Sequence, residues 1–270
     1  MTNTSATRSS RMPLVFFGHG SPMNVLDDNA YTRAWQQIGA ALPKPHAILC
    51  VSAHWFTRGT GVTAMDKPKT IHDFGGFPQA LFDMQYPAPG DPYLAARVRE
   101  LLAPVEVHAD HSWGLDHGTW SVLAKAFPGA DVPVVQLSID GTRPAAWHFE
   151  MGRRLAPLRD EGVLIIGSGD VVHNLRLMAR DSGAEFDWAR RFNDQVRSHL
   201  ERGEVEQIVE YEQWGGDDAR LSVPTPEHFL PLLYVVGAMQ PDEHVSIVAD
   251  GIDSGSISML TATIGMEAAA

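Results

Sequence analysis

The sequence of 270 residues is long enough for one substantial hydrophobic core, and it is acidic, with 21 Lys and Arg against 33 Asp and Glu and a net charge of −12. This charge disfavours nucleic acid and anionic membrane surfaces as partners, because both repel an acidic chain. The longest apolar run, 229–239, is far shorter than the roughly 20 residues that a membrane-spanning helix needs. The single cysteine excludes an intrachain disulfide and favours a cytoplasmic location.

Residues 1–11 are rich in Ser and Thr and carry no apolar segment long enough for a secretory signal, so they are predicted to form a disordered tail. Met12 directly precedes the first predicted strand and is a candidate start of the natural chain. Residues 12–265 show no repeat, linker or break in composition, which predicts a single domain.

Short apolar runs alternate along the chain with patterns of helical period. Strands are predicted over 14–17, 47–51, 105–107, 132–139, 163–166, 245–249 and 257–264, and helices over 31–42, 92–103, 119–127, 143–159, 186–202, 205–212 and 226–239. Strands that are apolar throughout are typical of burial on both faces. The sequence therefore predicts an α/β fold, a single domain with a central, mostly parallel sheet flanked by helices. The Gly- and Pro-rich stretch 57–89 is either a functional loop or holds short strands.

Three of the twelve histidines share one predicted position in the sheet. His19 follows the first strand, His54 follows the second, and His173 lies just beyond the strand at 163–166. The carboxyl ends of parallel strands meet at one edge, where ligands bind in open α/β sheets. His228, at the start of the apolar helix, is a fourth candidate. Because imidazole is the commonest metal ligand, the pattern predicts a transition-metal site.

The spacing of these histidines matches no zinc motif, so spacing alone leaves the alternative that each is a buried hydrogen-bonding or surface residue. A G-x-S-x-G nucleophile motif is absent from the sequence, which disfavours a serine hydrolase.

Six short motifs occur in a fixed order along the chain. They are Gly-His-Gly-Ser-Pro-Met-Asn at 18–24, Ser-Ala-His-Trp at 52–55, His-Asp-Phe-Gly-Gly-Phe-Pro at 72–78, Trp-Gly-Leu-Asp-His-Gly at 113–118, Val-Val-His-Asn-Leu at 171–175 and Pro-Glu-His at 226–228. Together they resemble the 4,5-DOPA extradiol dioxygenase family, bacterial type, of the class III extradiol ring-opening dioxygenases. The resemblance runs over nearly the whole of 12–265 and implies a class III extradiol dioxygenase-like catalytic domain there.

The resemblance also implies one divalent metal ion per chain. Its ligands would be His19, His54, His173 and His228. Glu227, beside His228, keeps open the two-histidine, one-glutamate set of the wider superfamily. Fe(II) is expected for activity, and Zn(II) is expected in the protein as isolated.

The family pattern has asparagine at position 170, where this chain has aspartate, and we expect the carboxylate to orient His173.

The function implied is the opening of a catechol such as DOPA with O2 to give a muconic semialdehyde. His117 is the predicted acid/base residue, with the alternative that it caps the helix that follows. His72 and Asp73, in a glycine-rich segment that resembles a lid, and Trp55 are predicted to bind the substrate. The expected partners are a small catechol and O2, and the expected assembly is a monomer or small homo-oligomer.

Two other functions remain open on the same scaffold: a zinc-dependent hydrolase and a non-catalytic metal-binding protein. Turnover of a catechol in air by anaerobically iron-loaded protein distinguishes them from a dioxygenase.

Overall fold

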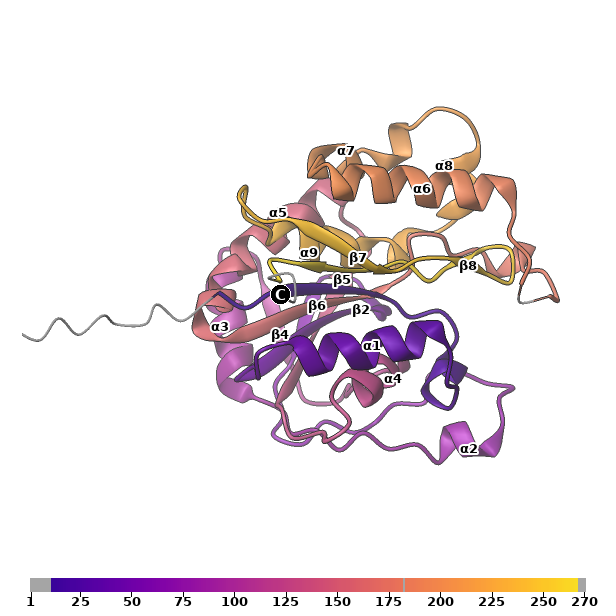
Figure 1. Cartoon of the computed structure of the whole chain (residues 1–270). Helices are drawn as coiled ribbons and strands as arrows, with labels where there is room; N and C mark the ends of the chain where they lie inside the picture. Colours follow the sequence, from indigo (N-terminus) through magenta and orange to yellow (C-terminus); the bar gives the residue numbers. More distant parts are fainter. Residues whose placement is uncertain (1–10, 182, 267–270) are drawn as a thin grey trace, which may run out of the picture.

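The fold is described from a computed structural model, which covers residues 11–181 and 183–266. Its main feature is an eight-stranded sheet with the order β4-β3-β5-β2-β6-β1-β10-β7. The sheet lies between two layers of helices (Figure 1). These strands are β1 (Leu14–Gly18), β2 (Ala47–Thr57), β3 (Thr60–Thr63), β4 (Val107–Asp110), β5 (Val134–Asp140), β6 (Val163–Gly169), β7 (Val245–Ala249) and β10 (Thr261–Ile264). The four central strands, β5, β2, β6 and β1, run parallel, and antiparallel pairs join β3 to β5 and β10 to β1 and β7. The predicted α/β class with a mostly parallel sheet is confirmed.

Helices cover both faces of this sheet. They are α1 (Ala30–Ala41), α2 (Gln79–Phe82), α3 (Pro92–Leu102), α4 (His117–Ala126), α5 (Ala145–Leu155), α6 (Asp187–Glu201), α7 (Val205–Val209), α8 (Asp218–Ser222) and α9 (Leu230–Gly237). Shorter elements are η1 (Pro22–Val25), η2 (Ala156–Glu161), η3 (Leu175–Leu177), η4 (Tyr211–Gln213), η5 (Pro226–His228), β8 (Ile252–Asp253) and β9 (Ile257–Ser258). In Figure 1, α1 and α4 lie on one side of the sheet, and α5, α6 and α9 lie on the other.

The apolar character of the central strands follows from these two helical layers. Along β1, Leu14 and Phe16 pack into the core beneath α5, α6 and α9, whereas Val15 and Phe17 pack into the core beneath α1 and α4. Successive side chains of a strand point to opposite faces, so a strand covered on both faces needs an apolar residue at every position.

Several predicted boundaries differ from the structure. The strand expected at 105–107 begins instead at Val107, and the strand expected at 257–264 is divided into β9 and β10. The stretch 57–89 holds a short strand, β3, and a helical turn, α2. The second strand continues to Thr57, because a shift in its register with β5 between Val51 and Phe56 lets the chain bulge and still rejoin the sheet.

Residues 1–10 of the predicted tail lie outside the described residues. Arg11, the last residue of that tail, donates from Nε to the carboxylate of Asp160 at 2.9 Å. Among residues 11–181 and 183–266, none of the helices combines the length and the apolar composition that crossing a membrane requires.

Candidate metal centre

His19 begins the loop after β1 and is 2% exposed. Its Nδ1 lies 3.0 Å from Ser168 Oγ, and the Ser168 hydroxyl donates to the carbonyl of Gly118 at 2.6 Å. A hydroxyl has one proton and a carbonyl only accepts, so Ser168 Oγ must accept a hydrogen bond from the N–H at His19 Nδ1. This hydrogen bond sets the tautomer of His19 and leaves the lone pair on Nε2 free to bind a metal ion.

Replacing Ser168 with alanine is therefore expected to weaken metal binding. The change removes the acceptor that orients His19, and loss of such a partner costs roughly 10–100-fold in metal affinity. Titration with a chromophoric zinc chelator measures the effect. Ser138→Ala is the control, because Ser138 is also buried in the sheet but bonds to Thr57 and Gly61. Equal affinity in both variants would contradict the orienting role.

His54 lies inside β2, in its bulged part, rather than after the strand as predicted. Its Nε2 is 3.2 Å from His19 Nε2. Two nitrogens at 2.0–2.1 Å from one tetrahedral zinc ion are about 3.3 Å apart, so this pair fits a shared ion. Burial, and then the nearby His117, lower the pKa of His54 to about 3. The imidazole is thus neutral at pH 7, as a metal ligand must be.

His228 completes η5 and is 7% exposed. Neither of its ring nitrogens has a hydrogen-bond partner among the described residues. Its ring centroid lies 5.4 Å from that of His19 and 5.1 Å from that of His54. Unpaired buried nitrogens beside two other imidazoles are typical of a site built to receive a cation.

His173 lies in the loop after β6 and stacks on His228, with ring centroids 3.4 Å apart and ring planes at 6°. The structure thus brings the rings of the four predicted ligands into one cluster. In the described part of the chain, two groups of three side chains have ligand atoms that all lie within 4.8 Å of one another. One group is His19, His54 and His117, and the other is His19, Asp170 and His228. His173 belongs to neither group.

Asp170 belongs to one of these groups, and its contact differs from the one predicted from the sequence. We expected it to orient His173, but its Oδ2 lies 3.4 Å from His19 Nε2. Its Oδ1 accepts the backbone N–H of Gly20 at 2.9 Å. Gly20 has a φ of 56°, which favours glycine and turns its N–H towards the carboxylate. The signal that could have found Asp170 is its position, since it directly follows β6 at the same sheet edge as His19.

His117 is the first residue of α4, and Asp116 caps that helix by accepting from Thr119 N at 3.1 Å. The alternative that His117 is the cap is therefore wrong. Asp73 contacts His117 twice: its Oδ1 accepts the backbone N–H of His117 at 2.9 Å, and its Oδ2 lies 3.0 Å from Nδ1. Burial raises the pKa of Asp73, but the bonds and charge of His117 outweigh it and the pKa is lowered.

The ring of His117 lies against that of His54, with centroids 3.8 Å apart. The absence of a side chain at Gly118 makes room for Ser52 and His54, because a Cβ there would lie 2.6 Å from Ser52 Oγ and 2.8 Å from His54 Cδ2. His117 thus has a fixed backbone, a carboxylate at Nδ1 and a place directly beside the candidate metal ligands.

These histidines line a cavity of about 840 Å³. Its walls are His19, Gly20, Ser21, Pro22, Met23, Asn24, Asp27, Asn29, Tyr31, His54, Asp73, Phe74, Phe77, His117, His173, Leu175, Met178, Gly183, His228, Ile252, Asp253, Ser254 and Ile257. The acidic residues in this described lining are Asp27, Asp73 and Asp253, and it includes neither Lys nor Arg.

Two of the predicted substrate-binding residues lie outside these walls. His72 bonds through Nε2 to the carbonyl of Met84 at 2.9 Å, and Trp55 stacks on Trp113 with ring centroids 5.5 Å apart. Asp73, by contrast, is in the wall of the cavity. The side chains of His72 and Asp73 diverge although the residues are adjacent, which the motif itself does not reveal.

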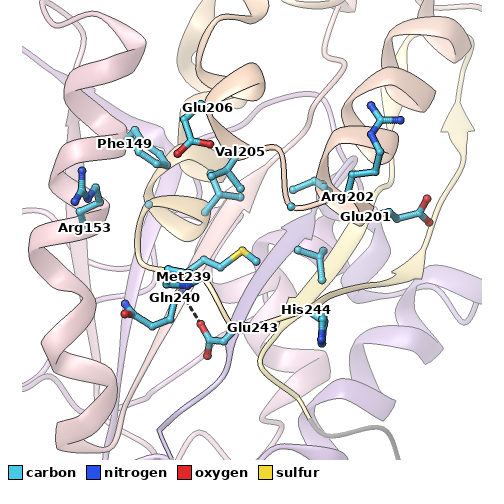
Figure 2. Close-up of a pocket in the computed structure, with 16 residues that line it drawn as sticks. Phe149, Arg153, Glu201, Arg202, Val205, Glu206, Met239, Gln240, Glu243 and His244 are labelled. Carbon is cyan, nitrogen blue, oxygen red and sulfur yellow. Dashed lines mark hydrogen bonds between the residues drawn. The ribbon is translucent and has the colours of Figure 1, made fainter.

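A second cavity, of about 740 Å³, lies between α5, the end of α6 and the segment before β7 (Figure 2). Four of its five charged side chains form ion pairs with residues of the fold: Arg153, Glu201, Arg202 and Glu243. Arg159 Nη1 donates to Glu243 at 2.7 Å, Glu243 also accepts the backbone N–H of Gln240, and Arg202 pairs with Glu204. These groups tie the chain segments together, so the histidine cavity is the candidate functional site.

Comparison with known proteins identifies the class to which this fold and site belong. The family model described as the catalytic LigB subunit of aromatic ring-opening dioxygenase matches residues 13–264. The chain belongs to this family and is an extradiol dioxygenase, which confirms the resemblance seen in the sequence motifs.

The similar proteins include 4,5-DOPA dioxygenase extradiol of Escherichia coli (strain K12), which is 59% identical over 262 residues, 95% of this chain and 96% of the relative. The protein of the same name from Beta vulgaris is 38% identical and covers 90% of this chain and 92% of its own. A crystal structure of an uncharacterized protein from Escherichia coli K12 superposes with a TM-score of 0.83 and 54% identity, covering 94% of this chain and 100% of that one.

Proposed function

We propose that this enzyme opens the ring of a catechol such as DOPA beside its two hydroxyl groups, incorporates both atoms of O2 and releases a muconic semialdehyde. One divalent metal ion, held by His19, His54, His173 and His228, would serve the reaction. The observation that carries this proposal is the pair of Nε2 atoms of His19 and His54, 3.2 Å apart in the wall of a cavity large enough for a catechol. When bound, Fe(II) offers open positions for substrate and O2 and exchanges electrons with them, which redox-inactive Zn(II) cannot do.

Proton transfer falls to His117. Ring opening requires a base for a catechol hydroxyl proton and later an acid for the oxygen released when the O–O bond breaks. Because Asp73 faces Nδ1 of His117, Nε2 is the ring nitrogen left for the substrate. The carboxylate also stabilises the imidazolium formed when His117 takes up the proton, so one residue serves as base and then as acid.

The walls of the cavity also support a substrate class. Phe74 and Phe77 present aromatic rings, with centroids 5.4 Å apart, for the planar catechol. Asp27 and Asp253 are carboxylates in the same walls. A catechol whose side chain carries an ammonium group therefore finds opposite charge here, and DOPA meets that condition through its amine.

Anaerobic loading with Fe(II), followed by O2 uptake with a panel of catechols, is the test. We expect uptake and a yellow semialdehyde with iron, and no uptake with zinc. Dopamine should show a lower KM than the anionic 3,4-dihydroxyphenylpropionate, by roughly two- to fivefold, the range of a partly exposed charge interaction.

The double variant Asp27→Asn/Asp253→Asn tests whether these two carboxylates cause the preference for a cationic catechol. It should reduce the difference in KM between the two catechols. Equal O2 uptake by the zinc-loaded and iron-loaded proteins would overturn the redox role of the metal. Absence of uptake from every loaded form would overturn the proposed opening of these catechols.

A further inference from the structure

Asp170 carries the next inference, which rests on the proposed metal site but not on the proposed reaction. The residue is 1% exposed and lies directly after β6. Its Oδ1 is engaged by Gly20, but Oδ2 has no hydrogen-bond partner among the described residues and lies 3.4 Å from the free nitrogen of His19. An unpaired carboxylate oxygen in a buried position is costly unless a cation or a hydrogen-bond donor meets it.

A second buried carboxylate of the same region shows what a purely structural role looks like. Asp116 is 0% exposed, and it accepts from Ser52 Oγ at 2.7 Å, from Thr119 N at 3.1 Å and from the Gln136 side-chain amide. Both of its oxygens are therefore partnered. Asp170 has a partner on one oxygen only, and the other is directed at the histidine cluster.

The surroundings of Asp170 Oδ2 indicate which kind of partner is missing. Oδ2 belongs to a group with His19 and His228 in which the ligand atoms all lie within 4.8 Å of one another. His228 likewise has no hydrogen-bond partner at either ring nitrogen. A divalent cation between the three would meet the lone pairs of all of them, whereas a water molecule has only two protons to donate.

We propose that Asp170 is an anionic ligand of the same metal ion as His19 and His228. Because His19 also lies beside His54, the donors around this ion would be imidazole nitrogens together with one carboxylate oxygen. The carboxylate thus makes this site more favourable than an all-imidazole site for hard cations such as Mn(II) and Fe(II), because hard cations prefer oxygen donors.

Asp170→Asn tests the proposal, because the amide oxygen can still accept from Gly20 while the charge is lost. We expect the Mn(II) dissociation constant, measured by electron paramagnetic resonance of free Mn(II), to rise by about 100-fold or more, since loss of a partner that only orients a ligand already costs roughly 10–100-fold. The Zn(II) dissociation constant, measured by chelator competition, should rise less. Asp66→Asn is the control and should leave both constants unchanged, because Asp66 is exposed and does not line the cavity.

Unchanged Mn(II) and Zn(II) affinities in Asp170→Asn would show that Asp170 only supports the turn at Gly20, and the proposal would fail. If that variant does not fold, a crystal structure of the zinc-loaded wild-type protein decides. Asp170 Oδ2 within about 2.0–2.2 Å of the ion supports the proposal, and a separation beyond 3 Å overturns it. Neither measurement uses a catechol or O2, so failure of the dioxygenase proposal would be seen separately.

Discussion

Replacing His117 with glutamine is expected to lower turnover of the iron-loaded enzyme roughly 10²–10⁴-fold, the usual contribution of a positioned proton-transfer group. Glutamine keeps a hydrogen-bonding side chain at the first position of α4 but cannot carry a proton between substrate and product. Metal content and catechol affinity should stay near their wild-type values. Stopped-flow turnover, metal analysis and catechol titration on one preparation measure all three quantities.

His111→Gln is the matched control for this variant. His111 is exposed and contributes nothing to the cavity walls in the described part of the chain, so turnover should not change. Loss of metal from His117→Gln would instead assign His117 to the ligands, in line with its grouping with His19 and His54. Wild-type turnover would mean that another group transfers the proton.

His19→Ala is expected to abolish metal binding at stoichiometric metal and, with it, O2 uptake. His19 belongs to both groups of metal-capable side chains, and its Nε2 lies beside both His54 Nε2 and Asp170 Oδ2. Removing it therefore takes away the ligand that the two groups share. Metal analysis after gel filtration, with O2 uptake on the same sample, gives the result.

The fold of His19→Ala should persist, because the imidazole contacts polar groups at the sheet edge and lies outside both hydrophobic core clusters. Thermal unfolding should be compared between the metal-free forms of variant and wild type, since bound metal alone raises the stability of the wild-type protein. A variant that retains one metal ion per chain with wild-type affinity would disprove the central role of His19.

The family motifs and the apolar strands were sufficient to predict the class of fold and the region of the site. Val15 and Phe16 lie on opposite faces of β1 and are both buried, so a run without polar residues correctly indicated a strand covered on two sides. The position of His19 after such a strand was likewise correct, because β1, β2 and β6 are parallel neighbours and share one carboxyl edge.

The sequence alone thus predicted the main strands and helices, the meeting of distant histidines at one edge of the parallel strands, and the family that the motifs resemble. Only the tertiary structure decided which side chains meet there. His54 reaches the site from a bulge within β2, Asp170 faces His19 instead of His173, and Asp73 rather than its neighbour His72 enters the cavity. The physical reason is that strand and helix periods follow from local apolar patterns, whereas the direction of a loop or bulge side chain depends on contacts with segments far away in the chain.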